Sequence, residues 1–333
     1  MESRGDPGMI RYLLRRLLYA IPILLGVNVL TFWLFFMVNT PDDMARMHLG
    51  NKHVTATAIA QWKTTHGYDQ PLFYNAHGTG INNWTHTLFY TKSIRMFALD
   101  FGSADDGRNI SHEIRSRAGP SLELALPAFM LGIWINIAVA LMMVWFRANW
   151  LDRLSVITAT MLMSISSLFY IIAGQFIVGR LWQWVPISGF VPGWNSWRFV
   201  LLPIIIAIIA GLGNGSRWYR SIFLEEIGKD YVRTARGKGL TESRILFVHV
   251  LRNGMIPILT GTVAVLPLLF MGSLLTESFF GIPGLGSYVV DAIQAQDFAV
   301  VRAMVFIGSV LYIIGLWLTD IAYSWADPRV RLS

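Results

Sequence analysis

The chain has 333 residues, of which 54% are hydrophobic and only 14% are charged, and its mean hydropathy is +0.49. Soluble globular domains usually carry about 25% charged residues, so this composition excludes an ordinary soluble domain and indicates a membrane protein. No cysteine is present, which excludes disulfides, thiolate metal sites and a cysteine nucleophile. The net charge of +7 would suggest a nucleic-acid partner in a soluble protein. Here the cations lie beside apolar segments, so we expect no nucleic acid.

Six segments are apolar over about 20 residues, the length that an α-helix needs to cross a bilayer. In chain order they are Ile10–Val38, Pro120–Phe146, Leu154–Trp184, Phe199–Trp218, Met255–Thr276 and Val300–Tyr323. A polar tail, residues 1–8, precedes the first segment, and no small-residue cleavage site follows it. The sequence therefore predicts an all-α membrane protein with six transmembrane helices, the first of them uncleaved.

Lys and Arg residues between the segments predict the orientation of the chain. With six spans, four cation groups fall on one side of the membrane, and the opposite turn at residues 189–198 carries only Arg198. The four groups are Arg11, Arg15 and Arg16; Arg147 and Arg153; Arg217, Arg220, Lys229, Arg233, Arg236, Lys238, Arg244 and Arg252; and Arg329 and Arg331. The positive-inside rule makes their side cytoplasmic and places both termini there.

Residues 39–119, between the first and second spans, are polar and fall on the extracytoplasmic side of this topology. The stretch has its own aromatic residues, among them Trp62 and Tyr68, and turn signals at His77-Gly78 and Gly80. Loops this long are usually functional or separately folded. We therefore expect a small folded cap on the outer mouth.

The largest cation group belongs to the stretch KDYVRTARGKGLTESRILFVHVLRN, residues 229–253. The positive-inside rule alone accounts for its cations but not for its spacing. Helix-forming residues run over Glu225–Lys238, Gly239 offers a left-handed helix stop, and Thr241 can cap a second short helix. On that second helix, apolar residues recur at Ile245, Val248 and Leu251. Helix, glycine turn and helix is more order than a passive loop requires.

The sequence YVRTARGKGL…HVLRN within this stretch resembles the cytoplasmic EAA loop of bacterial ABC importer permeases, in the form found in the dipeptide/oligopeptide family. The general pattern of that loop is E-A-A-x3-G-x9-I-x-L-P. The matching positions here are Arg233-Thr234-Ala235, Gly239, His249, Leu251 and Arg252. The chain departs from the general pattern at several of them and follows the variant of peptide-type permeases.

Further stretches resemble landmarks of the B-type permease subunit of this peptide/nickel family, in the same order along the chain. They are MIRYLLRRLLYAIPILLGVNVLTF from Met9, GYDQPL, LDFGS, LELAL, WLDRL, ESFFGIPGLG and the closing DPRVR. The resemblance covers nearly the whole chain from Met9. It implies the type I ABC importer permease fold, with a transmembrane domain over residues 9–333, a periplasmic loop at 39–119 and a cytoplasmic coupling loop at 217–254.

The resemblance also implies partners and a location in the bacterial inner membrane. The partners would be a second, C-type permease in a pseudo-two-fold heterodimer, two cytoplasmic ATP-binding subunits, a periplasmic or extracellular substrate-binding protein, and membrane lipid. ATP and Mg would bind to the ATPase subunits, and we expect no cofactor on this chain. The substrates would be short peptides (di- or oligopeptides). Nickel, glutathione and peptide antibiotics, carried by relatives in the same family, stay open as alternatives.

In this family the loop forms a coupling helix that docks on an ATPase subunit and transmits its motion to the spans. The resemblance therefore implies a set of ATPase-coupling residues in this chain. They are Tyr231, Val232, Arg233, Thr234, Ala235, Arg236, Lys238, Gly239, Leu240, His249, Leu251 and Arg252.

Polar residues near the spans give a second candidate site. Glu277 ends the fifth predicted span, and an ionisable residue at membrane depth is a functional hypothesis by default. We expect it at the outer interface, where solvation is easy. With it we group the turn that follows as a candidate periplasmic gate: Gly281, Pro283, Gly284 and Gly286. We expect the polar residues within spans to form interhelical hydrogen bonds rather than bind substrate: Asn28, Asn136 and Gln175.

No motif for catalysis or ATP binding is present. The phosphate loop G-x4-G-K-[ST] is absent, since Gly228-Lys229 is followed by Asp230 and Gly237-Lys238 by Gly239. We therefore expect the chain not to be an enzyme and its energy to come from partner subunits. The alternative from another class is a self-sufficient secondary transporter, which inverted repeats and deep ionisable pairs would favour. We find neither in the sequence.

Overall fold

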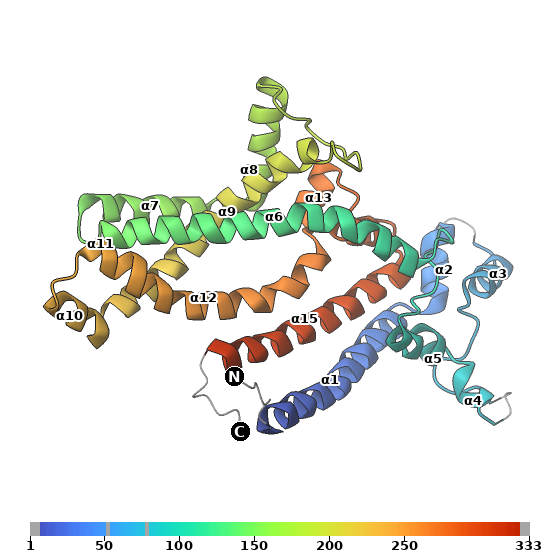
Figure 1. The fold of residues 1–333 in the computed structure, drawn as a ribbon. Helices are drawn as coiled ribbons and strands as arrows, with labels where there is room; N and C mark the ends of the chain where they lie inside the picture. Colours follow the sequence, from blue (N-terminus) through green and yellow to red (C-terminus); the bar gives the residue numbers. More distant parts are fainter. Residues whose placement is uncertain (1–6, 51–53, 77–79, 327–333) are drawn as a thin grey trace. The chain divides into compact units, whose positions relative to one another are not determined.

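The structure is a computed structural model that describes residues 7–50, 54–76 and 80–326. Most of the polar tail, the His77-Gly78 turn and the closing DPRVR stretch lie outside the described residues. Within them, the only β pairing is an isolated bridge between Ser103 and Asn109. The α-helices in Figure 1 are α1 (Pro7–Trp33), α2 (Pro41–Leu49), α3 (Ala56–His66), α4 (Asn82–Thr85), α5 (Leu88–Lys92), α6 (Ile110–Trp145), α7 (Trp150–Ser164), α8 (Ser167–Gly174), α9 (Trp197–Ile227), α10 (Asp230–Gly237), α11 (Glu242–Arg244), α12 (Leu251–Val265), α13 (Leu274–Phe280), α14 (Leu285–Gln294) and α15 (Phe298–Ala326).

Several helices continue into segments with other hydrogen-bond patterns. Three are π-helical: η1 (Leu34–Val38), η3 (Gln175–Leu181) and η4 (Ile245–Val250). Two are 3-10 helices: η2 (Ile94–Ala98) and η5 (Leu266–Met271).

Five stretches of the described chain are long and apolar enough to cross a membrane: Leu18–Val38, Ile110–Trp145, Trp197–Ile227, Glu242–Met271 and Phe298–Ala322. A bent pair, α7 followed by α8 and η3 with an angle of 88° between its halves, brings the number to six when the pair is counted as one span. The prediction of an all-α membrane protein with six spans is thereby confirmed. The bend lies inside the third predicted span, Leu154–Trp184, which is therefore not one straight helix.

The bend has a local cause that apolar residue counts do not reveal. Ile165 and Ser166 take extended backbone conformations, with ψ of 131° and 142°, so α7 ends and α8 begins between them. The Tyr170 hydroxyl donates a hydrogen bond to the carbonyl oxygen of Leu162 at 2.7 Å across the break. That bond satisfies one of the carbonyls that the end of α7 leaves open.

The fifth span also differs from its predicted bounds, Met255–Thr276. It begins at Glu242 and ends at Met271. The span ends before Gly272, whose φ of +68° lies in a backbone region that residues other than glycine rarely adopt.

The chain divides into two compact units, with boundaries inside α6, α14 and α15. Unit 1 comprises the described residues up to Ser116 together with Val289–Ile313, and unit 2 comprises Arg117–Tyr288 and the described residues from Ile314. Unit 1 therefore holds the first span and all but the last three residues of the segment, 39–119, that the sequence predicts as a cap. The predicted coupling loop, residues 217–254, and the candidate gate belong to unit 2.

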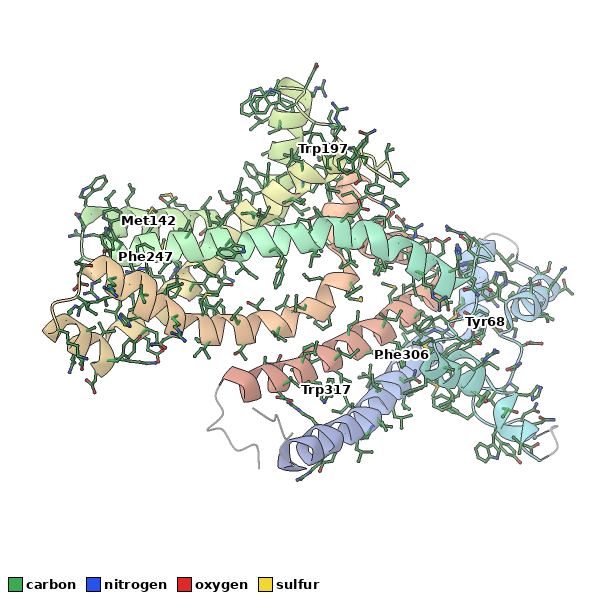
Figure 2. The ribbon with its side chains drawn as sticks, viewed as in Figure 1. Tyr68, Met142, Trp197, Phe247, Phe306 and Trp317 are labelled. Atoms are coloured by element: carbon green, nitrogen blue, oxygen red, sulfur yellow. The ribbon has the colours of Figure 1, made fainter. Side chains whose placement is uncertain are left out.

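In unit 1, residues of α2, α3 and α5 pack onto the end of the first span. Phe32 and Phe36 from that span are buried against Met44, Tyr68 and Leu88. Phe298 at the start of α15 packs on the same cluster. Tyr68 and another residue of unit 1, Phe306, are labelled in Figure 2. The predicted cap segment therefore uses the span end as part of its core, rather than folding around a core of its own.

In unit 2, α6, α7 and α9 lie side by side (Figure 1). A Cβ atom on Gly213 of α9 would overlap the carbonyl oxygen of Ala159 in α7, so glycine permits this close helix crossing. Arg220 adds an ion pair with Asp152, in which Nη2 lies 2.9 Å from each of the two carboxylate oxygens. Packing at the crossing and charge near its end thus hold α7 against α9.

Candidate functional site

Helix α10 is a short amphipathic helix within the basic segment between the fourth and fifth spans. Val232 and Ala235 are buried, Val232 completely, whereas Arg233, Thr234 and Lys238 are exposed. Buried and exposed residues follow the helical repeat. α10 therefore buries an apolar face in unit 2 and leaves a basic face exposed.

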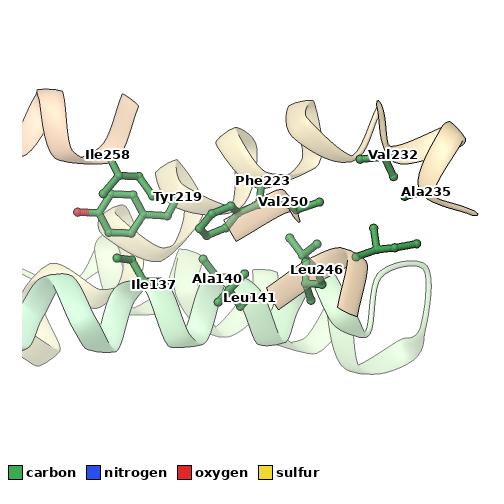
Figure 3. Close-up of a cluster of buried hydrophobic side chains, with 12 residues drawn as sticks. Ile137, Ala140, Leu141, Tyr219, Phe223, Val232, Ala235, Leu246, Val250 and Ile258 are labelled. Atoms are coloured by element: carbon green, nitrogen blue, oxygen red, sulfur yellow. The ribbon is translucent and has the colours of Figure 1, made fainter. Parts of the chain in front are cut away.

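The apolar face of α10 shares a hydrophobic core with four other elements of unit 2, α6, α9, η4 and α12, which belong to three spans (Figure 3). α6 contributes Ala140 and Leu141, α9 contributes Phe223, and η4 contributes Leu246 and Val250. Packed cores of this kind transmit strain, because they do not deform continuously. A displacement of α10 is therefore coupled to the spans that contain α6, α9 and η4.

Polar contacts fix both ends of α10. Before its start, buried Glu226 accepts a hydrogen bond from the Tyr231 hydroxyl at 2.9 Å. After its end, Gly239 has a φ of +74°, the left-handed stop that the sequence predicted. Arg236 then donates from Nε and Nη2 to the two carboxylate oxygens of Glu242, at 2.6 and 3.1 Å. This ion pair links the two sides of the glycine turn.

The first predicted helix, Glu225–Lys238, is broken in the structure. α9 ends at Ile227, and Lys229 takes an extended ψ of 153° before α10 begins. Gly228 lies at the break, and glycine is a poor helix former in a continuous helix. The break lets α10 take a direction of its own after α9.

The second predicted helix is not a separate short helix, because α11, η4 and α12 run on into the fifth span. The predicted apolar repeat is also wrong. Ile245, Leu246 and Val250 are buried, whereas Val248 is 51% exposed. A π-helix bonds i to i+5, so residues that share one face are farther apart in sequence than in an α-helix. Thr241 precedes the helix as predicted but makes no side-chain cap.

The predicted coupling residues divide into two groups by exposure. The exposed ones are Arg233, Thr234, Lys238, Gly239 and Arg252. The buried or partly buried ones are Tyr231, Val232, Ala235, Arg236, Leu240, His249 and Leu251. Sequence reasoning missed Glu226 and Glu242, which hold the two ends of α10. The Glu226 pairing had a readable signal, since Lys229 follows three residues later and donates to its carboxylate.

Glu277 is fully buried, which corrects the prediction of a solvated position at the outer interface. Its carboxylate accepts hydrogen bonds from Ser121 Oγ at 2.9 Å and from the backbone N–H groups of Ser273 and Ser287, both at 3.0 Å. Ser121 Oγ in turn accepts a hydrogen bond from the Leu285 N–H at 2.7 Å. Burial raises the pKa of the Glu277 carboxyl, and these donors oppose the rise. One carboxylate thus joins α6, α13 and α14.

The glycines around Glu277 have a packing reason. Cβ atoms on Gly272 and Gly284 would overlap its two carboxylate oxygens, and a Cβ on Gly286 would lie 2.6 Å from the carbonyl carbon of Ser273. Gly281 ends α13 in the left-handed conformation, with a φ of +63°. The structure therefore places Gly284 and Gly286 of the candidate gate beside the Glu277 carboxylate or its backbone donors, whereas Gly281 and Pro283 are exposed.

The polar residues within the spans behave differently from one another. Gln175 donates to the carbonyl oxygens of Ile187 and Phe279 at 3.1 and 2.9 Å, which is a contact between elements, as predicted. Asn136 donates to the Gly132 carbonyl of its own helix at 2.7 Å, so the interhelical prediction is wrong for this residue.

Asn28 donates to the Ser93 carbonyl at 3.3 Å, and Ser93 lies outside the spans. Asn28 also donates to the sulfur of Met96 in η2 at 3.9 Å, so it bonds between two helices as predicted, although η2 is not a span. Among the residues that the structure describes, no three His, Asp or Glu side chains are grouped to hold a metal ion.

An open cavity of about 390 Å³ lies in unit 2, lined by α6, α9 and the η5–α13 segment. Its wall is mostly apolar and includes Phe129 and Ile208, with Asn136 and Thr276 among its polar residues. Ser273 belongs both to the wall and to the Glu277 network. The buried carboxylate therefore holds one residue of the cavity wall in place.

Comparison with known proteins identifies the family. Residues 128–332 match the family described as binding-protein-dependent transport system inner membrane component, and residues 9–98 match its N-terminal counterpart. The chain belongs to this family of inner-membrane permeases. Like the family, this permease is a multi-pass membrane protein and a component of a larger transport system.

Relatives of the permease match along nearly their whole length. A putative peptide transport system permease protein of Brucella abortus (strain 2308) is 33% identical over 328 residues, which cover 97% of this chain and 99% of the relative. The glutathione transport system permease protein GsiC of Salmonella typhimurium (strain LT2) is 31% identical over 324 residues, with the same coverage of 97% and 99%.

Proposed function

We propose that this permease is the B-type transmembrane subunit of an ATP-driven ABC importer and forms part of the path for short peptides. The observation that carries the coupling role is α10, whose basic face is exposed while its apolar face shares a core with elements of three spans. That arrangement suits a surface on which a separate ATPase docks. The ATP and Mg would then be held by two cytoplasmic ATPase subunits, with a C-type permease and a substrate-binding protein completing the complex.

The peptide class is supported by the relatives. One is named for peptide transport and the other for glutathione, which is itself a tripeptide. Both match this chain almost end to end. Nickel and peptide antibiotics are the competing substrates within the family resemblance, and nothing in the described residues groups ligands for a nickel ion.

Charge reversal on α10 tests the coupling role. We expect Arg233→Glu and Gly239→Pro each to lower peptide-stimulated ATP hydrolysis by the complex, or to release the ATPase subunits during purification. Arg233 is exposed, so Arg233→Glu reverses a charge on the docking face. Gly239 has a positive φ that proline cannot adopt, so Gly239→Pro disrupts the turn after α10. Arg198→Glu is the matched control, because Arg198 is exposed and lies on the predicted outer side. Peptide import by this chain without any ATPase partner would refute the importer and favour a secondary transporter.

The topology is tested with single cysteines, since the chain has none of its own. Lys238 and Pro283 are both exposed in the structure. We expect Lys238→Cys to react with a membrane-impermeant maleimide only from the cytoplasmic face, and Pro283→Cys only from the periplasmic face. Labelling of both residues from one face would overturn the proposed orientation.

A further inference from the structure

The cavity in unit 2 lies at the middle of two spans. Its wall uses Leu124–Asn136 of α6 and Ala207–Gly211 of α9, together with the end of the fifth span. Its volume of about 390 Å³ is within the roughly 300–1,000 Å³ that is usual for small-ligand sites. The cavity is therefore large enough to receive part of a substrate.

The chemistry of the wall restricts the kind of group that can enter. None of its described lining residues is Asp, Glu, Lys, Arg or His. An ionised terminus or a charged side chain would lose its hydration there without gaining a counter-ion, which is strongly unfavourable. An apolar or aromatic side chain would gain free energy, because it leaves water for a wall made mostly of apolar groups.

Asn136 supplies a buried polar group in this wall. Its Nδ2 donates to the Gly132 carbonyl, while its Oδ1 accepts no hydrogen bond from the described residues. Oδ1 is packed against Gly215 of α9 and has almost no exposed surface, so Asn136 belongs to the wall as a packed polar group and not as an open acceptor. A few polar groups in an apolar wall are typical of a ligand site.

Two glycines keep the cavity open. A Cβ built on Gly132 or on Gly211 meets no atom within 4 Å, and both residues line the cavity. Gly215 differs from these two glycines, because a Cβ there would lie 2.6 Å from Asn136 Oδ1 and would disturb the packing between α6 and α9. A larger side chain at Gly132 or Gly211 would therefore take up cavity volume without a clash in the helix crossing.

We propose that this cavity is a specificity subsite that receives an uncharged, bulky apolar side chain of the transported peptide, with Gly132 and Gly211 setting the largest side chain that fits. This inference rests on the proposed peptide import. It assigns to the permease a share of the selection that a binding protein alone would otherwise supply.

The test is peptide uptake by the complete complex in proteoliposomes, with one binding protein used throughout. Ala-Ala and Ala-Phe are the two probes, and the variants are Gly132→Leu and Gly211→Leu. Gly119→Leu is the matched control, since it is on the same helix as Gly132, is exposed, has open space at Cβ and lies outside the cavity. Leucine is a better helix former than glycine, so the backbone gives no reason for the variants to misfold.

We expect the two cavity variants to lower Ala-Phe uptake about tenfold or more, the size of effect that one or a few carbon atoms produce in an apolar pocket. Ala-Ala uptake should stay within about twofold of the wild type, a free-energy change of less than ~0.5 kcal/mol, and the Gly119 variant should change neither. Equal loss of both peptides, or no change in either, would overturn the subsite. Loss of the partner permease from the purified variants would instead assign the cavity to an interface between permeases. Failure of the wild-type complex to import either peptide would refute the proposed function itself.

Discussion

The buried carboxylate of Glu277 allows a sharp test of what holds α6, α13 and α14 together. Its partners Ser121, Ser273 and Ser287 all donate, and an ionised carboxylate can accept from all of them. Glutamine keeps the shape but replaces one acceptor oxygen with an NH₂ group. That group would face a donor, either the Ser287 N–H on one side or the Ser121 and Ser273 groups on the other.

The expected cost follows from the groups left without a partner. Glu277→Gln leaves at least one buried donor unpaired, which costs about 1–3 kcal/mol. Glu277→Ala strands all three donors and leaves a void, so we expect about 3–5 kcal/mol. A kilocalorie per mole lowers the Tm of a domain of 150–250 residues by roughly 2–4 °C. The alanine variant should therefore lose clearly more thermal stability than the glutamine variant.

The assay is the apparent Tm of the purified complex in detergent, measured for both variants, for Ser121→Ala and for the double variant. Ser121 and Glu277 are in direct contact, so the double variant should be less destabilised than the sum of the two single variants, by about 0.5–3 kcal/mol. Glu225→Gln is the control, because Glu225 is exposed, and it should change stability by less than about 0.5 kcal/mol. If Glu277→Gln matches the wild type and the two sites are additive, the carboxylate is not the hydrogen-bond acceptor described above.

Two further predictions concern other parts of the chain. Gly213→Ala should destabilise unit 2 by about 1–3 kcal/mol, because the new Cβ would overlap the Ala159 carbonyl oxygen. Gly211→Ala, two residues away and with open space at Cβ, should be neutral or slightly stabilising. Equal Tm values for the two variants would contradict the close crossing of α7 and α9. Burial lowers the pKa of Lys92 from its usual 10.5 to about 8, so above pH 8 the unfolded chain holds this proton more tightly than the native protein. Stability should therefore rise between about pH 8 and pH 10 through this group, and Lys92→Met should flatten that rise in a pH series of Tm measurements; an unchanged slope in the variant would count against the shift.

The sequence was sufficient for the features that depend on long apolar runs and local glycine chemistry. The spans and the left-handed stop at Gly239 follow from patterns that extend over one helix or one turn. The bend at Ile165 and Ser166 was not predictable in this way, because both residues are compatible with an apolar helix and neither is a proline or glycine that would mark a break.

The candidate sites show the same division. The amphipathic pattern of α10 was readable, but the register of η4 was not, since a π-helical segment changes which residues share a face. Glu277 was found by its charge. Its burial, however, requires hydrogen-bond donors for the carboxylate, and one of them is the hydroxyl of Ser121, 156 positions earlier in the chain. Long-range partners of this kind cannot be read from spacing along a single sequence.

The shared core of α10 has a mechanical consequence for the loop between the fourth and fifth spans. Lifting α10 from unit 2 would expose Val232 and the side chains that it covers, and each fully buried apolar side chain contributes about 1.5–3 kcal/mol. A pull applied to the exposed face therefore meets a stiff element that resists local unfolding. Work delivered to Arg233 or Lys238 would be spent on moving whole helices, and little would be dissipated in unravelling the loop.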